Sequence, residues 1–231
     1  MLELDGVHGG YSNSEVLFGI SLSLDRGQVA TLMGRNGMGK TTTLRTIMGS
    51  LHASAGRIVF NGVDITQLPS HKIARLGIGY VPEGRKIFPN LSVRENLEMA
   101  ARGDQRSQWT IQTVLKLFPR LGERLARPGF QLSGGEQQML AIGRALMLNP
   151  KLLLLDEATE GIAPVIRDEI WRTLSELKSA GISILVVDKE VEELCKLAEK
   201  HHLIEKGMVT WTGSSADLLA NVELQTKYLA L

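Results

Sequence analysis

Gly34-Arg-Asn-Gly-Met-Gly39-Lys40-Thr41 is the most informative stretch of this sequence. It matches the pattern G-x-x-x-x-G-K-[S/T], whose glycines let the backbone pass close to the phosphate groups of a ligand. The run Val29-Ala-Thr-Leu-Met33 immediately before it is typical of a short buried strand, and a helix is expected to begin near Gly39. A loop in this context predicts a phosphate-binding site in an α/β fold and disfavours a chance match.

Each polar group of this loop has an expected role. Successive backbone N–H groups form an anion-binding nest, to which the positive N-terminal end of the following helix adds. Lys40 is expected to reach the β- and γ-phosphates, and the Thr41 hydroxyl to ligate Mg²⁺. The predicted cofactors are therefore ATP and Mg²⁺. The nucleotide-binding residues predicted in this loop are Gly34, Arg35, Asn36, Gly37, Met38, Gly39, Lys40, Thr41 and Thr42.

A second candidate lies where an apolar run ends in two acids. Leu152 to Leu155 is too apolar for a half-exposed strand, and Asp156 and Glu157 follow it directly. Ligands of parallel sheets bind at the carboxyl ends of the strands. We therefore predict that Asp156 holds Mg²⁺ and that Glu157 is the general base, acting with Lys40 in catalysis. Acids that only end a strand and cap the next helix are the structural alternative.

Composition excludes several other classes of protein. The net charge is +1 with acids and bases mixed, so the sequence gives no electrostatic footprint for nucleic acid. The longest apolar runs, Leu152 to Leu155 and Ile182 to Val187, are strand-sized. We expect no secretion signal, because the N-terminus alternates polar and apolar residues, and no internal disulfide, because Cys195 is the single cysteine. A reducing, cytosolic location follows, with any membrane contact made through a partner.

Periodicity and turn signals predict the order of the remaining elements. Residues 1–33 read as β-structure, residues 89–150 as helical, and a helix then a strand follow each other near the C-terminus, which implies a parallel core sheet. The individual signals are an Asn61-Gly62 hairpin, capping boxes at Ser92/Glu95 and Ser133/Glu136, a helix over 167–179, a strand over 182–187, a Lys206-Gly207 hairpin, and short helices near Ser215 and Glu223. His201 and His202 lack metal-ligand spacing, and Cys195 reads as a small core residue.

Leu132-Ser-Gly-Gly-Glu-Gln-Gln138 opens one of these helices. It is either an ordinary capping box with glycines or a second helix N-terminus that contacts a phosphate. Here the chain resembles the ABC ATPase family, whose signature is this LSGGQ-like sequence. The resemblance implies a head-to-tail dimer in which the signature of one subunit meets ATP on the phosphate loop of the other. The residues it assigns to ATP are Ser133, Gly134, Gly135 and Glu136, and Tyr11 as the aromatic that stacks on adenine, although an edge-strand aromatic is an alternative for Tyr11.

The resemblance also implies a fold and a branch of the family. The expected fold is α/β: a P-loop NTPase core with a mainly parallel sheet, an antiparallel β subdomain and a helical subdomain. Residues 1–231 would form one ABC ATPase domain, with the core and β subdomain in 1–88 and 150–231 and the helical signature subdomain in about 89–149. The stretches 80–85, 87–89 and 161–164 look like the ATP-binding subunit of branched-chain (hydrophobic) amino-acid importers.

That branch implies the partners and location. They are two membrane permease subunits, a second ATPase subunit in a homo- or heterodimer, and a periplasmic or extracellular binding protein reached through the complex. The chain would lie on the cytoplasmic side of the membrane as a peripheral protein, with the helical segment facing the permease. Branched-chain amino acids as the transported solute are implied by the resemblance alone, and other small solutes are alternatives. A soluble, non-transport ABC ATPase is the alternative; a P-loop kinase or GTPase fits less well, because of the signature and the missing guanine-reading motif.

Four positions depart from the commonest family pattern. Glu83 stands where a glutamine usually senses Mg²⁺ and water, and a carboxylate there can still bind a hydrated cation. Ala158 replaces a proline, and Ala163 replaces an aspartate that communicates across the dimer. Lys189 replaces the histidine that usually contacts the γ-phosphate. A lysine can stabilise phosphate charge as a cation, and a solvated loop lysine is the structural alternative.

Overall fold

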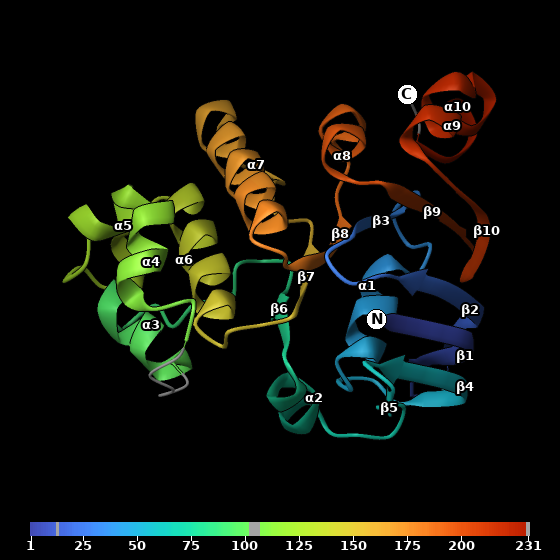
Figure 1. The fold of residues 1–231 in the computed structure, drawn as a ribbon, viewed down its shortest axis with the longest axis horizontal. Helices are drawn as coiled ribbons and strands as arrows, with labels where there is room; N and C mark the ends of the chain where they lie inside the picture. The colour runs from blue at the N-terminus through green and yellow to red at the C-terminus, as the bar shows by residue number, and fades with distance from the viewer. Residues whose placement is uncertain (13, 102–106, 230–231) are drawn as a thin grey trace.

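The computed structural model describes residues 1–12, 14–101 and 107–229 and contains two β-sheets (Figure 1). The larger sheet has six strands in the order β10-β9-β3-β8-β7-β6, with β10 antiparallel to β9 and the other neighbours parallel. Its strands are β3 (Val29–Met33), β6 (Ile78–Val81), β7 (Leu152–Asp156), β8 (Ser183–Val187), β9 (Lys200–Glu205) and β10 (Met208–Gly213). The expected parallel core sheet is confirmed.

The central strands are apolar along their whole length because both faces of the sheet are covered. In β3, Val29 and Met33 pack into one hydrophobic cluster, while Ala30 and Leu32 pack into the other. Strand β7 divides in the same way. This two-residue alternation explains why β3 and β7 read as continuous apolar runs.

The smaller sheet is antiparallel, with strand order β2-β1-β4-β5. Its strands are β1 (Leu2–Tyr11), β2 (Ser14–Leu24), β4 (Ala53–Phe60) and β5 (Val63–Asp64). The turn between β4 and β5 has φ of 49° at Asn61 and 80° at Gly62, which are the positive angles that the predicted hairpin requires. Lys206 and Gly207, at 48° and 74°, form the second predicted hairpin between β9 and β10.

Helix α1 (Lys40–Ile47) lies between the two sheets (Figure 1). Its buried residues Leu44 and Ile47 belong to a hydrophobic cluster that includes side chains from both sheets. The sheets also meet directly, because the backbone N–H of Phe18 in β2 donates to the carbonyl of Gly207 at 2.8 Å. The helix that carries the phosphate loop is therefore held on two sides.

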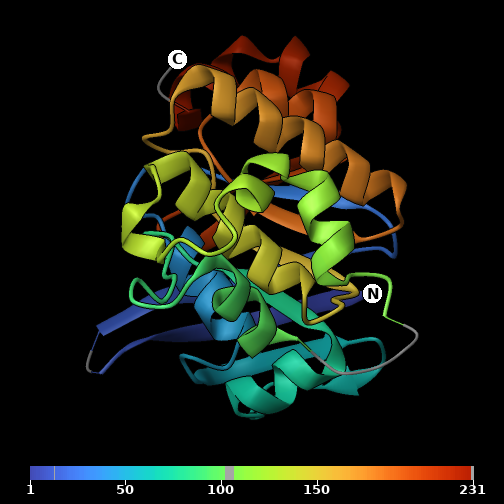
Figure 2. The ribbon, with the colours of Figure 1, turned by 90° about the vertical axis from the view of Figure 1, so that its left-hand side faces the viewer.

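A group of helices lies beyond β6, away from the antiparallel sheet, and Figure 2 views this group face on. Its members are α3 (Val93–Ala100), α4 (Ile111–Leu117), α5 (Pro119–Glu123), the 3-10 helix η1 (Gly129–Gln131) and α6 (Gly134–Leu146). Both predicted capping boxes are present, at Ser92 and at Ser133. Gly143 allows α6 to pack closely, since a Cβ there would lie 2.9 Å from Val114 Cγ1.

The remaining helices cover the sheet and the C-terminal strands. They are α2 (Ser70–Leu76), α7 (Pro164–Ser179), α8 (Val191–Leu197), α9 (Ser215–Ala220) and α10 (Val222–Leu229). Helix α7 begins at Pro164, three residues before the expected start, because proline is well suited to the first helical position. Helix α2 and strand β6 are short elements that the sequence patterns did not predict. No helix in the described part of the chain is long and apolar enough to cross a membrane.

Candidate nucleotide-binding and hydrolysis site

The phosphate loop connects β3 to α1 and depends on glycine at two points. Gly34 has a φ of 149°, and a Cβ there would lie 2.3 Å from the carbonyl oxygen of Ile204. Gly39 precedes α1 at a φ of 108°, and no side chain caps this helix start. The Lys40 ammonium donates to the carbonyls of Gly34 at 2.8 Å and Arg35 at 3.0 Å. The loop thus presents an uncapped helix terminus and a cation at one place, which suits a phosphate.

A cavity of about 520 Å³ opens in front of this loop. Its lining joins β1, β2, the phosphate loop, α1 and the turn after β7. The predicted site residues that line it are Tyr11, Asn36, Gly37, Gly39, Lys40, Thr41, Thr42, Glu83 and Glu157, and two unpredicted residues, Val16 and Glu160, join them. Gly34, Arg35, Met38 and Asp156 are not among its lining residues.

Met38 fixes the loop instead of facing the cavity. Its carbonyl accepts the N–H of Gly207 at 3.0 Å, and its sulfur accepts the N–H of Lys206 at 3.3 Å. The β9–β10 hairpin therefore anchors the back of the loop. At the other side of the cavity, the Tyr11 hydroxyl accepts a hydrogen bond from Arg45 at 3.2 Å, which orients the ring.

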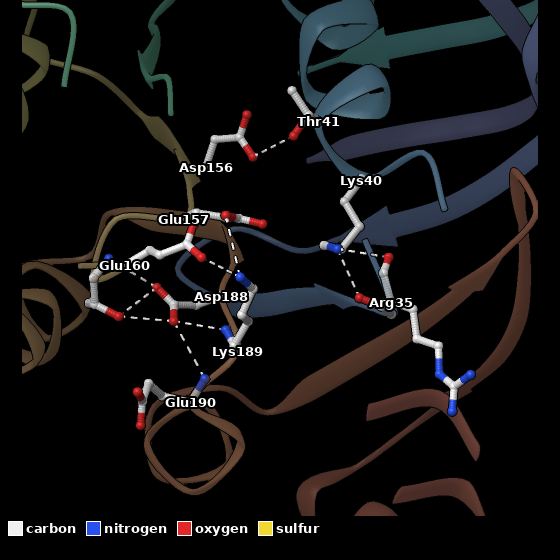
Figure 3. A network of polar contacts seen from close by, with 11 residues as sticks. Arg35, Lys40, Thr41, Asp156, Glu157, Glu160, Asp188, Lys189 and Glu190 are labelled. Atoms are coloured by element: carbon white, nitrogen blue, oxygen red, sulfur yellow. Dashed lines mark hydrogen bonds and ion pairs between the residues drawn. The ribbon is translucent and has the colours of Figure 1, made fainter. Parts of the chain in front are cut away.

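The Asp156 carboxylate lies at the buried end of β7 and accepts two hydrogen bonds. Thr41 Oγ1 donates to one oxygen at 3.0 Å, and the Tyr80 hydroxyl donates to the other at 3.1 Å (Figure 3 shows the first). Burial raises the pKa of Asp156, and these two hydrogen bonds oppose that effect. Two oxygens of the kind that Mg²⁺ prefers, one from Thr41 and one from Asp156, are thus in direct contact as the sequence predicts.

Glu157 sits in a left-handed backbone conformation, with a φ of 49°, and its N–H donates to the carbonyl of Val187 at 2.8 Å. Its side chain turns toward Lys189 and Glu160 (Figure 3). Two main effects raise the pKa of Glu157 to about 7: the larger is a hydrogen bond with the Glu160 carboxyl, and the smaller is burial. A general base works best with a pKa near the operating pH, so this environment suits proton transfer from water.

The loop after β8 is tied to the loop after β7 through a buried carboxylate. Asp188 accepts the N–H of Thr159 at 3.1 Å and the Thr159 hydroxyl at 2.8 Å. It also accepts the backbone N–H of Lys189 at 2.8 Å. The Lys189 ammonium pairs with Glu160 and lies 4.0 Å from Glu157 Oε2. Lys189 is therefore beside the candidate base, although it is not itself among the residues that line the cavity.

The signature residues lie elsewhere. Ser133 caps α6, and its N–H donates to Glu136 Oε2 at 2.7 Å. A Cβ at Gly134 would lie 2.5 Å from an Arg85 nitrogen, and one at Gly135 would lie 2.4 Å from Ile166 Cγ2. None of the four residues 133–136 is among those that line the 520 Å³ cavity. The two glycines thus serve close packing within the chain, and the exposed Ser133 end of the helix lies outside the cavity at the chain's own phosphate loop.

Sequence reasoning missed three neighbours of this site. Tyr80 comes from the short strand β6, and nothing in its pattern reveals a contact with Asp156. Val16 reaches the cavity from β2, beside Tyr11. Glu160 carries one usable signal, because it follows Glu157 by three residues in a turn closed by a 3.4 Å hydrogen bond from its N–H to the Glu157 carbonyl.

Three features meet at the carboxyl ends of the strands of the parallel sheet. They are the glycine-rich phosphate loop, the buried Asp156 carboxylate beside the Thr41 hydroxyl, and the Glu157 carboxyl group, which is suited to accept a proton. Together with the capped signature helix, they define the class as a P-loop ATPase with a helical signature segment. Comparison with known proteins gives the family. The family model described as "ABC transporter" matches residues 17–160, and the chain belongs to this family of ATPases.

Full-length relatives agree with this assignment. The chain is 41% identical over 231 residues to the high-affinity branched-chain amino acid transport ATP-binding protein BraG of Pseudomonas aeruginosa, covering 99% of each. It is 32% identical to a probable branched-chain amino acid transport ATP-binding protein, LivF, of Archaeoglobus fulgidus, covering 97% of each. It is also 32% identical to the lipopolysaccharide export system ATP-binding protein LptB of Haemophilus influenzae, covering 99% of this chain and 97% of that protein.

Solved structures confirm the fold. One described as an ATP-binding subunit of an ABC transporter superposes with a TM-score of 0.85 at 27% identity, covering 100% of this chain and 96% of that chain.

Proposed function

We propose that this chain is the energy-coupling ATPase subunit of a membrane importer for branched-chain amino acids or similar small solutes. The observation that supports this class of transported solute is the 41% identity to BraG over essentially the whole of both chains. The similarity to LptB is lower, at 32%, and favours lipid export as a second candidate. Nothing in the comparisons favours a soluble, non-transport ATPase.

The residues around the cavity support the following roles. Lys40 and the loop amides bind the phosphates, Arg35 and Thr42 flank them, and Tyr11 offers its ring to adenine beside Val16. Thr41, Asp156 and Glu83 would hold Mg²⁺, which when bound neutralises phosphate charge. The contact of Thr41 with Asp156 supports this set, although Glu83 comes from another loop.

Two side chains would act on the reacting groups. The Glu157 carboxyl accepts the proton of the attacking water, and its position at the cavity wall with a pKa of about 7 supports that role. The Lys189 ammonium, 4.0 Å from the Glu157 carboxylate, stabilises phosphate charge. This role replaces the neutral acceptor that a histidine would supply.

The signature residues are proposed to act on a second subunit, identical or related. Ser133 is exposed at the start of α6, and residues 133–136 lie outside the chain's own cavity. A head-to-tail pair would bring Ser133 to Glu136 of one subunit to the phosphate loop of the other. Each chain then supplies half of two sites.

A separate cavity of about 420 Å³ supports docking of the permease. It lies between the core and the helical segment 89–149, and apolar side chains such as Met48 and Ala141 line it together with Arg85 and Arg144. The guanidinium of Arg144 lies over the ring of the exposed Phe88, 4.4 Å from the centroid. An apolar floor with a cationic rim suits a short amphipathic helix of a membrane partner. The chain would thereby sit at the cytoplasmic face of the membrane, and a binding protein would join on the other side.

The test is reconstitution with candidate permease subunits from the same genome. The complex is expected to accumulate radiolabelled leucine in vesicles in an ATP-dependent way, and Glu157→Gln is expected to abolish uptake while ATP still binds. Leucine-independent ATPase activity with lipopolysaccharide extraction would replace the importer by the export candidate. Purification with ribosomes and without membrane subunits would refute both.

A further inference from the structure

Glu160 is the one acidic residue in the cavity lining that neither the sequence patterns nor the proposed roles use. It follows Glu157 in the turn after β7, and one carboxylate oxygen from each of Glu83, Glu157 and Glu160 lies within 4.8 Å of the other two. Its partner is Lys189, which comes from the loop after β8. Figure 3 shows the lysine side chain reaching across to both Glu157 and Glu160.

The backbone of Lys189 is fixed without help from Glu160. Its N–H donates to the buried Asp188 carboxylate at 2.8 Å, and Thr159 holds the same carboxylate. The side chain differs, because it is about half exposed, at 48%. A lysine side chain is long and flexible, so its ammonium takes one place only if a partner holds it.

Glu160 is the group that gives the ammonium this place. The Glu160 carboxylate forms the short contact with Lys189, while Glu157 lies at 4.0 Å and is more deeply buried. An exposed ion pair of this kind adds little to the stability of the fold. Its effect is therefore on where the cation lies and not on whether the chain folds.

We propose that Glu160 is a positioning residue for ATP hydrolysis, which holds the Lys189 ammonium beside Glu157, a residue that lines the phosphate cavity. The inference rests on the proposed action of Lys189 on phosphate charge. It adds the requirement that the lysine be aimed by a carboxylate from the neighbouring loop. Lysine and glutamate would therefore act as one unit at this end of the sheet.

The test is a double-mutant cycle on the full chain, with hydrolysis measured by phosphate release. Glu160→Gln and Lys189→Met are each expected to lower kcat roughly tenfold, an effect of the size found for the coupling between residues in contact. The glutamine amide of Glu160→Gln can still hydrogen-bond the Glu157 carboxyl, so this variant mainly removes the charge that holds Lys189. The double variant is therefore expected to lose no more than Lys189→Met alone. KM for ATP is expected to stay within about twofold, since binding by the loop is unchanged. Glu160→Asp keeps the charge and is expected to recover part of the lost rate.

Glu193→Gln is the matched control. Glu193 forms an exposed pair with Lys196 at 2.6 Å on α8, away from the cavity lining, so this variant is expected to hydrolyse ATP at the normal rate. Three results would overturn the inference: a normal rate in Glu160→Gln, a further loss from Glu160→Gln in the Lys189→Met background, or equal losses in the control. If Lys189→Met is itself normal, the proposed role of the lysine falls as well. Failure of leucine uptake with these rate effects intact would refute the cargo and leave the inference standing.

Discussion

Acid is expected to destabilise this chain through two adjacent buried histidines in β9. His201 and His202 are 0% and 1% exposed, and their Nδ1 atoms form 2.8 Å hydrogen bonds with Thr31 and Thr212. Burial lowers the pKa of each from an ordinary 6.5 to about 4. Between these values the unfolded chain binds more protons than the folded chain. The contribution of the two histidines to the free energy of unfolding therefore has its full value above pH 6.5, where both are neutral in either state, and it decreases as the pH falls from 6.5 toward 4.

The size of the effect follows from the pKa of His202. For a fully dry site, the linkage relation gives a loss of about 2 kcal/mol in the free energy of unfolding between pH 7 and pH 5. With a urea m-value of roughly 2.5 kcal/mol per molar for a chain of this length, the midpoint shifts by about 0.8 M.

Glu157 has a raised pKa and contributes with the opposite sign, so the wild-type curve alone does not isolate the histidine. The measurement is urea unfolding of the wild type and of His202→Gln, each at pH 7 and pH 5. The glutamine keeps a polar partner for Thr212 and does not titrate. The stability advantage of the wild type is expected to shrink by about 2 kcal/mol at the lower pH. An advantage that is equal at both pH values would refute the reasoning.

Three further substitutions test the site and its supports. Glu157→Gln is expected to retain ATP binding and to lower hydrolysis by roughly 10²–10⁴-fold, measured by phosphate release and nucleotide titration, and near-normal turnover would remove Glu157 as the base. Gly135→Ala places a Cβ 2.4 Å from Ile166 Cγ2 and is expected to lower hydrolysis roughly tenfold by moving the signature helix. Adding Ile166→Ala should restore part of that rate, and no recovery would contradict a steric cause. Gly143→Ala brings a Cβ 2.9 Å from Val114 Cγ1. The overlap costs about 2 kcal/mol against a gain of about 1 kcal/mol in helix propensity, so denaturation should show a net loss of about 1 kcal/mol.

Sequence reasoning predicted the features whose chemistry is local. The phosphate loop, the Asn61-Gly62 turn and the Ser133 capping box each need particular residues within a few positions, and the structure has all three elements. Strand β6 was not predicted from the sequence, because it has only four residues and includes Gly79. Its place is set by packing on β7, which no local pattern expresses.

Side-chain contacts between the ends of neighbouring strands were not predicted from the sequence either. Glu160 and Lys189 are 29 residues apart and meet only because β7 and β8 are neighbours in the sheet. The Tyr80 hydroxyl likewise reaches Asp156 from a strand 76 residues earlier. Parallel order could be predicted, but the side-chain reach across it could not, because it depends on register and on the turns after each strand.

The burial of α1 between the two sheets gives ligand binding a reach beyond the loop itself. A nucleotide present at a free concentration about 100 times its dissociation constant stabilises the folded chain by about 2.7 kcal/mol. Leu44 and Ile47 cannot leave their positions without opening the hydrophobic cluster that both sheets share. A ligand at the first turn of α1 is therefore expected to raise the melting temperature of the whole core. Hydrogen exchange is expected to slow throughout the antiparallel sheet, although of its residues only Tyr11 and Val16 line the cavity.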